Sequence, residues 1–131
     1  IHDAVRPLVR PDVVRRVAQA ASRCGAAIAA IPATETVKEV AEAGRIVRTP
    51  PRRTLWCART PQGFHRDLIL KAHREAAAAG FEGTDDSELV ERLGHEVRVV
   101  EDHYDNVKIT TDQDLAVAEA LLRWQESNRA N

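Results

Sequence analysis

Hydrophobic and polar positions in the first quarter of the chain predict a helix followed by a strand. Pro11 stands where a proline is common in a first helical turn, and Gly25 is the kind of residue that ends a helix. Between them, apolar or small residues recur at helical spacing: Val13, Val14, Val17, Ala20, Ala21 and Cys24. The apolar run 26–31 then ends at Pro32, which predicts a short buried strand.

Residues 34–48 have a different pattern, which predicts a β-hairpin rather than a core element. Apolar or β-branched residues flank a turn-like Glu-Ala-Gly sequence at 42–44: Thr36, Val37, Val40, Ile46 and Val47. Pro50 and Pro51 follow, and neither can donate a hydrogen bond to a neighbouring strand. We therefore expect a hairpin arm over about 34–54 with a stiff exit.

The middle of the chain predicts a short strand and then a helix. Residues 55–58 have the composition of a strand. Thr60 has the character of an N-cap residue, and Pro61 would then occupy the first position of a helix. Apolar residues continue from there toward Gly80. We therefore expect a helix that begins at Thr60 and Pro61.

The last third predicts two more helices and two more strands. Thr84 is expected to start a helix that ends at Gly94, because two aspartates in its first turn complement the helix dipole. Strands are expected over 96–100 and 107–110, and a final helix from about Thr111. Alternating strands and helices indicate an α/β fold with a largely parallel sheet, in which ligand sites lie at the carboxyl ends of strands.

The composition excludes several classes of protein. Of the 131 residues, 44% are hydrophobic and 30% are charged, and the net charge is −1. Such a globular chain has no overall field that would recruit nucleic acid or an anionic membrane. No apolar run approaches the roughly 18 residues of a membrane-spanning helix, so we expect a cytoplasmic protein. Cys24 and Cys57 lack the spacing of a metal or redox motif, so two free thiols are expected.

Polar clusters stand where strands are expected to end, and each one has an ordinary explanation. Asp3 and Arg6 could form a local ion pair, Thr60 and Thr84 could serve only as helix caps, and Lys108 could be solvated at a strand edge. Taken together they favour a phosphate site, because helix N-termini, arginine and lysine are the groups that hold phosphate. A carboxylate such as that of Asp3 could face Mg²⁺ or a substrate hydroxyl.

Six motifs occur in a characteristic order and spacing. They are Asp3-Ala4-Val5-Arg6-Pro7, Thr36-Val37-Lys38, Arg52 with Leu55-Trp56, Thr60-Pro61-Gln62-Gly63-Phe64, Thr84-Asp85-Asp86, and Asn106-Val107-Lys108-Ile109-Thr110 with Asp114-Leu115. Over roughly residues 1–122 this arrangement resembles the 2-C-methyl-D-erythritol 4-phosphate cytidylyltransferase family.

The resemblance implies a fold and a set of site residues. The fold would be a three-layer, Rossmann-like nucleotidyltransferase fold, that of the nucleotide-diphospho-sugar transferases, incomplete here and with a protruding β-hairpin arm. Residues 1–131 would form the C-terminal part of one such domain. The implied catalytic residues are Lys108, Asp3 and Arg52, and Arg52 would act in the neighbouring subunit. The implied substrate-binding residues are Asp3, Ala4, Arg6, Thr36, Arg52, Thr60, Thr84 and Lys108.

The implied reaction transfers CMP from CTP to 2-C-methyl-D-erythritol 4-phosphate. It yields 4-diphosphocytidyl-2-C-methyl-D-erythritol and pyrophosphate, a step of the non-mevalonate isoprenoid pathway. The family further implies a Mg²⁺ cofactor, with Asp3 as the candidate ligand, and a homodimer formed through the hairpin arm. The glycine-rich loop with which the family holds CTP has no counterpart here. Because the chain opens at Ile1 and contains no methionine, we expect it to be part of a longer protein. We expect this part to be inactive by itself.

Two alternatives stay open at this point. Ribitol 5-phosphate cytidylyltransferase shares several of the motifs, and Val5 favours it, whereas Leu55-Trp56 and Thr84-Asp85-Asp86 favour the methylerythritol enzyme. A non-catalytic module that only dimerises or binds a phosphate ligand is the second alternative. Glu35 and Arg59 stand where the family commonly has aspartate and glutamine, which affects the expected substrate preference rather than the reaction type.

Overall fold

The protein is described by a computed structural model that covers residues 1–129. The helices and strands in chain order are α1 (Pro11–Cys24), β1 (Ala26–Pro32), β2 (Glu39–Val40), β3 (Ile46–Arg48), β4 (Trp56–Phe64), α2 (Arg66–Ala78), α3 (Asp86–Arg92), β5 (Arg98–Glu101) and α4 (Asp112–Arg129). Two short 3₁₀ turns lie at Glu42–Gly44 and Arg52–Thr54. The predicted helix 11–24 and the strand after it are confirmed, and Gly25 ends α1 with a φ of 89°.

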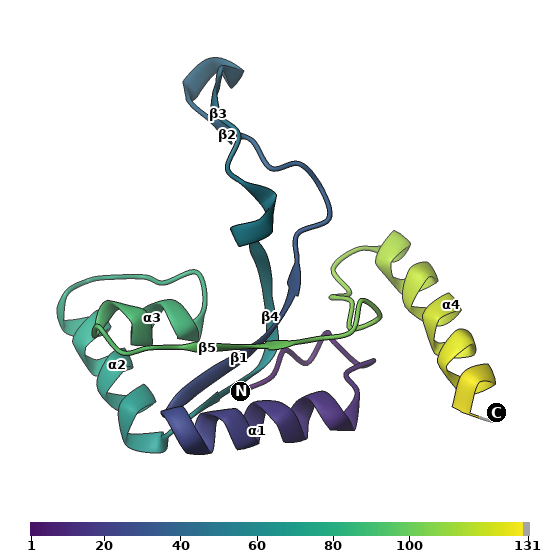
Figure 1. Cartoon of the computed structure of the whole chain (residues 1–131), viewed down its shortest axis with the longest axis horizontal. Coiled ribbons are helices and arrows are strands. Elements are labelled where there is room, and N and C mark those ends of the chain that lie inside the picture. Colours follow the sequence, from purple (N-terminus) through teal and green to yellow (C-terminus); the bar gives the residue numbers. More distant parts are fainter. Residues whose placement is uncertain (130–131) are drawn as a thin grey trace.

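The central sheet has three strands in the order β4-β1-β5 (Figure 1). β1 pairs with β4 in the antiparallel sense and with β5 in the parallel sense. The α/β fold class is thus confirmed, whereas the expectation of a largely parallel sheet is wrong for the described residues. The reason is that β4 returns to β1 directly through the hairpin arm, and a hairpin connection joins antiparallel strands.

Helices cover both faces of this sheet. On one face, Val13, Val17 and Ala21 of α1 pack against Ala27 and Ala29 of β1. On the other face, Ala26 joins a core formed by α2 and α3, with Ala72, Ala76, Leu89 and Val90. The side chains of β1 are buried on both faces because successive residues of a strand point to opposite sides.

The predicted helix start at Thr60 and Pro61 is wrong. Both residues lie inside β4, and α2 begins at Arg66 with His65 as its N-cap. The strand continues because the edge of β1 offers pairing partners as far as Ala26, which lies opposite Phe64. This long-range pairing overrides the local preference of a Thr-Pro pair for a helix start.

The packing of α1 on β4 also explains a glycine in this segment. A Cβ atom at Gly63 would lie 3.1 Å from Cβ of Ala21 and 3.2 Å from Cγ1 of Val17. A side chain at this position would therefore make unusually tight contacts with α1, and Ala21 and Val17 would have to shift to accept it.

Two further expectations need correction. Residues 107–110 form no strand, and their link to the neighbouring segment is a hydrogen bond from the Ile109 N–H to the Val5 carbonyl at 2.9 Å. Thr84 is not the N-cap of α3. Asp85 holds that position, and its carboxylate accepts a hydrogen bond from the Glu88 N–H. Aspartate caps a helix at least as well as threonine does, so the cap lies one residue further along.

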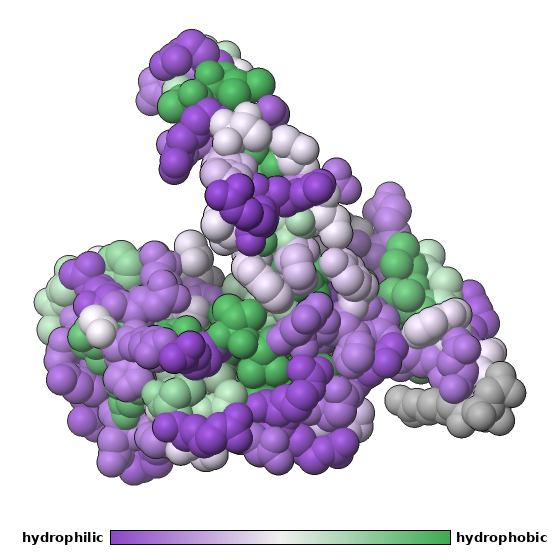
Figure 2. Space-filling view, in the orientation of Figure 1, coloured by the Kyte–Doolittle hydropathy of each residue, from purple (hydrophilic) through white to green (hydrophobic). Residues whose placement is uncertain are grey.

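The predicted hairpin is present and extends away from the body as an arm (Figure 1). A hydrogen bond of 3.0 Å from the Ala33 N–H to the Leu55 carbonyl closes its base. Its apolar side chains are exposed: Val37, Val40, Ile46 and Val47. Figure 2 shows hydrophobic surface at the tip of the arm among polar residues. An isolated two-stranded hairpin is marginally stable in water, so this arm needs a surface to pack against.

Helix α4 stands at the opposite side of the molecule from α2 and α3 (Figure 1). Its Gln125 side chain is buried and donates hydrogen bonds to the Asp105 carboxylate at 2.8 Å and to the Leu8 carbonyl at 3.4 Å. Among residues 1–129, no helix combines the length and the apolar character needed to cross a membrane.

Candidate functional site

A cavity of about 410 Å³ brings together five of the eight residues for which the sequence predicts a site. These are Asp3, Arg6, Thr60, Thr84 and Lys108. They come from the N-terminal segment, from β4, from the start of α3 and from the loop before α4. The other lining residues are Ile1, Ala58, Arg59, Gln62, Asp85 and Asp86.

One carboxylate organises two cations at this cavity. Oδ2 of Asp3 accepts a hydrogen bond from Nε of Arg6 at 3.1 Å and lies 3.4 Å from Nζ of Lys108. Burial by itself raises the pKa of the Asp3 carboxyl, but hydrogen bonds and charge from Arg6 and Lys108 outweigh burial and lower it. Asp3 is therefore charged near neutral pH and holds both cations beside the cavity.

Thr60 joins the N-terminal segment to β4. Its hydroxyl oxygen accepts a hydrogen bond from the Asp3 N–H at 3.0 Å, and it lies 2.8 Å from Nδ1 of His2. His2 in turn places Nε2 3.1 Å from the Arg6 carbonyl oxygen. The threonine that we expected to cap a helix thus fixes the position of the Asp3 backbone instead.

Below the cavity, Asn106 is fully buried and connects three segments. Its side-chain Nδ2 donates to the Thr60 carbonyl at 2.8 Å and to the Asp102 carboxylate at 2.7 Å. Its backbone carbonyl accepts hydrogen bonds from Nη1 of Arg6 at 2.9 Å and from Nη1 of Arg59 at 3.1 Å. Because Lys108 follows two residues later, this network sets the position of the lysine.

The acidic residues at the start of α3 are engaged within the protein. The Asp85 carboxylate accepts hydrogen bonds from Nε2 of Gln62 at 2.8 Å, from the Ser87 hydroxyl and from the Glu88 N–H. Burial raises the pKa of Asp85, and these hydrogen bonds more than offset it, so the pKa is lowered. Thr84 lines the cavity, and its N–H and hydroxyl both donate to the Glu88 carboxylate.

The remaining predicted site residues lie outside this cavity. Thr36 is exposed on the arm, and Ala4 is exposed beside Asp3. Arg52 is exposed at the base of the arm, where its Nη1 donates to the Thr34 carbonyl at 2.9 Å. With Pro32, Ala33, Pro51, Arg53 and Trp56, it lines a separate cavity of about 500 Å³. Within one chain, Arg52 and Thr36 are thus not part of the site around Lys108.

Asp3 does not fit the predicted role of metal ligand well. One of its oxygens already faces both Arg6 and Lys108, and cations at that distance oppose a divalent metal. In residues 1–129, no three histidine, cysteine, aspartate or glutamate side chains converge in a way that could hold a metal ion. We therefore derive no step of the chemistry from a metal held by these residues.

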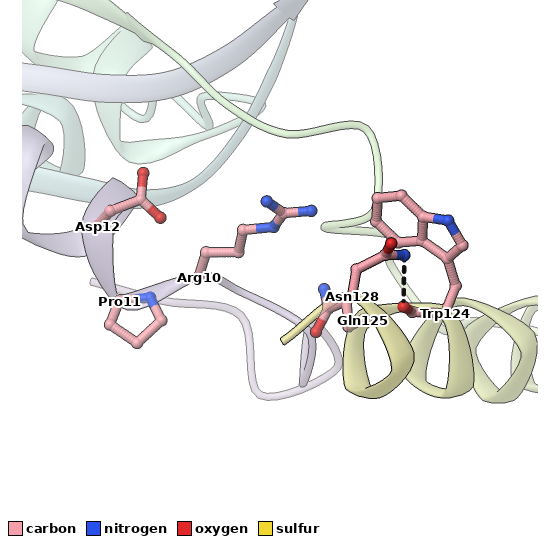
Figure 3. Close-up of a pocket in the computed structure, with 6 residues that line it drawn as sticks. All are labelled: Arg10, Pro11, Asp12, Trp124, Gln125 and Asn128. Carbon is pink, nitrogen blue, oxygen red and sulfur yellow. Dashed lines mark hydrogen bonds between the residues drawn. The ribbon is translucent and has the colours of Figure 1, made fainter. Parts of the chain in front are cut away.

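A third hollow, of about 250 Å³, lies between the start of α1 and α4 (Figure 3). The Arg10 guanidinium lies over the Trp124 ring, 5.9 Å from its centroid, and forms an ion pair with Asp105. Gln125 donates to the same carboxylate. Because these polar groups are paired with one another, we interpret the hollow as the junction that holds α4, not as a ligand site.

The sequence linked Arg59 only to substrate preference and predicted no role for Gln62 or Asn106, although all three belong to or adjoin the quoted motifs. Gln62 is buried and bridges Asp85 to the Ser87 N–H, so it fixes the start of α3 beside the cavity. The available signal was a polar residue in a strand otherwise rich in small and apolar residues. It could be read only once residues 60–64 were known to be a strand.

Solved structures support this description of the fold. The crystal structure of 2-C-methyl-D-erythritol 4-phosphate cytidylyltransferase from Thermus thermophilus matches this chain with a TM-score of 0.83 and 41% sequence identity. The match covers 93% of this chain and 60% of that one. A 4-diphosphocytidyl-2C-methyl-D-erythritol synthase from Anaerococcus prevotii matches with a TM-score of 0.87 and 34% identity. This match covers 93% of this chain and 55% of the other. The fold is therefore part of an α/β nucleotidyltransferase fold, as the sequence predicted.

Sequence comparisons identify the family. The family model IspD, 2-C-methyl-D-erythritol 4-phosphate cytidylyltransferase, matches residues 1–124. Relatives with that name include one from Syntrophus aciditrophicus, 52% identical over 96% of this chain and 54% of its own length. Another, from Geotalea uraniireducens, is 49% identical over 98% of this chain and 55% of its own length. The chain belongs to the 2-C-methyl-D-erythritol 4-phosphate cytidylyltransferase family, and it spans about half the length of these relatives.

Proposed function

We propose that this chain supplies the acceptor-phosphate half of a cytidylyltransferase active site. The acceptor is 2-C-methyl-D-erythritol 4-phosphate, and the donor is CTP, which brings Mg²⁺ as its own counter-ion. The observation that carries the proposal is the convergence of Asp3, Arg6, Thr60, Thr84 and Lys108 on one cavity in a chain of this family. Family members bear the name of this activity, which favours it over ribitol 5-phosphate.

In the proposed reaction, a phosphate oxygen of the acceptor attacks the α-phosphorus of CTP. A new P–O bond forms, the bond to the β-phosphate breaks, and pyrophosphate leaves. Two anions must approach each other, so Lys108 and Arg6 would lower their repulsion in a partly water-excluded site. Asp3 would hold both cations in place. No side chain is needed as a nucleophile, because phosphoryl chemistry of this kind depends on position and charge.

The arm would complete the site in a homodimer. Its exposed apolar side chains favour packing on a second copy, since a two-fold interface gives both arms the same partner surface. Arg52 and Thr36 lie on or beside the arm and away from the cavity of their own chain. We propose that they reach the substrate phosphate bound by the partner, where a guanidinium can make a two-point contact.

Direct binding tests the proposal on the chain itself. Isothermal titration calorimetry with 2-C-methyl-D-erythritol 4-phosphate should show one site per chain that Lys108→Ala weakens, and ribitol 5-phosphate should bind less tightly. Equal binding of the two phosphates would contradict the assigned acceptor, and no binding would contradict the proposal as a whole. Pyrophosphate release from CTP and Mg²⁺ then tests transfer, which we expect only from a protein that also holds a CTP loop.

A further inference from the structure

Three cations line the cavity, and two of them are paired. Arg6 and Lys108 share the carboxylate of Asp3, at 3.1 Å and 3.4 Å. Arg59 forms no ion pair with a carboxylate in residues 1–129, although it lines the same cavity. Its hydrogen bonds go to backbone carbonyls instead, from Nη1 to His103 at 3.0 Å, to Tyr104 at 3.4 Å and to Asn106 at 3.1 Å.

The surroundings leave the charge of Arg59 incompletely balanced. Burial lowers the pKa of the guanidinium and the nearby Arg6 adds to this change, and together they outweigh the opposing effect of the Asp102 and Asp105 carboxylates. Arg59 and Arg6 donate to the same carbonyl oxygen, that of Asn106, which brings two like charges to one point. Like charges at a partly buried site raise the free energy of the empty site, and a bound anion relieves it.

The hydrogen-bonding capacity of Arg59 is also only partly used. A guanidinium carries five N–H donors in a fixed fork. Within residues 1–129, all three hydrogen bonds of Arg59 come from Nη1 alone, so the other donors remain available to a ligand in the cavity that this residue lines. An anion with several oxygens, such as a phosphate, matches both the fork and the unbalanced charge.

We propose that Arg59 binds the substrate phosphate in this cavity as a third cation beside Arg6 and Lys108, and thereby sets the preference of the site for a phosphate dianion. This inference rests on the proposed function for the identity of the substrate. Its support is the geometry of the cavity, in which Arg59 is the lining cation that the described carboxylates leave unpaired.

A purely structural role for Arg59 predicts different behaviour of two variants. Arg59→Gln keeps an N–H donor for the loop carbonyls but removes the charge. Arg59→Lys keeps the charge but cannot donate to three carbonyls from the same planar group. If Arg59 binds phosphate, the glutamine variant is the more damaging. If it only holds the His103–Asn106 loop, the lysine variant is.

The experiment measures affinity by calorimetry on the whole chain, with 2-C-methyl-D-erythritol 4-phosphate and with inorganic phosphate as probes. For Arg59→Gln we expect roughly tenfold weaker binding of both, the usual size of a lost charge-assisted hydrogen bond. Arg59→Lys should stay within about threefold, because its point charge remains. The wild-type affinity should also fall more steeply with salt than that of Arg59→Gln. Salt screens the attraction between the Arg59 charge and the phosphate, and only the wild type has this attraction.

Thermal melting checks that both variants are folded, and if Arg59→Gln does not fold, Arg59→Lys decides by keeping or losing affinity. Unchanged affinity in Arg59→Gln, or greater damage in Arg59→Lys, overturns the assignment of Arg59 and leaves the proposed function intact. Wild-type chain that binds only inorganic phosphate, with the expected dependence on Arg59, overturns the proposed substrate but supports Arg59. If the wild-type chain binds neither probe, both proposals are wrong.

Discussion

Replacing Asn106 by alanine removes the central donor beneath the cavity. The side chain is fully buried, and its Nδ2 makes two hydrogen bonds, to the Thr60 carbonyl at 2.8 Å and to the Asp102 carboxylate at 2.7 Å. Its Oδ1 is buried without a hydrogen-bond partner among the described residues, so only the two donated bonds count. Both acceptors stay buried or partly buried in the variant.

The size of the effect follows from these two contacts. A hydrogen bond to a neutral carbonyl contributes about 1 kcal/mol and one to a charged group about 2 kcal/mol, so Asn106→Ala should lose about 3 kcal/mol of unfolding free energy. For a domain of this size the melting temperature should fall by roughly 10 °C. Asp102 keeps its hydrogen bond from the His103 N–H at 2.8 Å, which limits the loss.

Urea denaturation followed by circular dichroism measures this loss as a lower midpoint at an unchanged slope. Asn128→Ala is the matched control, because Asn128 is exposed and donates to the Trp124 carbonyl of its own helix. We expect the control to change stability by less than about 0.5 kcal/mol. If Asn106→Ala lowers the free energy of unfolding by less than about 1 kcal/mol, the hydrogen bonds of Asn106 do not stabilise the segments around the cavity.

Three further predictions concern the charged residues. In the active enzyme, Lys108→Ala should lower kcat by about 100-fold or more, whereas Lys38→Ala on the exposed arm should have a small effect; equal losses would mean that the catalytic lysine is wrongly assigned. Mixing Arg52→Ala and Lys108→Ala subunits should restore about a quarter of the wild-type activity, because half the dimers then hold one intact site. If mixing restores nothing, Arg52 acts in its own subunit. The pKa of Asp105 is lowered: burial raises it, but hydrogen bonds from Arg10 and Gln125 and the charge of Arg10 outweigh burial. Asp105 therefore stabilises the fold above its unfolded pKa of about 3.9, and this is lost as the pH falls toward the folded pKa. Asp105→Asn should show a shallower loss of stability in acid denaturation below about pH 4 than the wild type, and identical acid slopes would contradict this.

The sequence alone was sufficient to predict those elements whose local pattern agrees with their packing in the fold. Helix α1 begins at Pro11 and ends before Gly25 as its pattern predicts, because both residues act through their own backbone geometry. The hairpin arm and the buried strand β1 follow from short-range patterns in the same way. The order and spacing of the motifs indicated the family, which the comparisons confirm.

Tertiary structure decided what depends on partners distant in the sequence. Residues 60–64 form a strand because β1 is there to pair with them, and no local property of Thr60 or Pro61 reports that edge. The same holds for the site. Arg6 and Asn106 are 100 positions apart and share a hydrogen bond of 2.9 Å. The charge of Arg59 matters only because the fold pairs Arg6 and Lys108 with Asp3 and leaves Arg59 to backbone carbonyls. Residue types determine which contacts are possible, and chain topology determines which of them form.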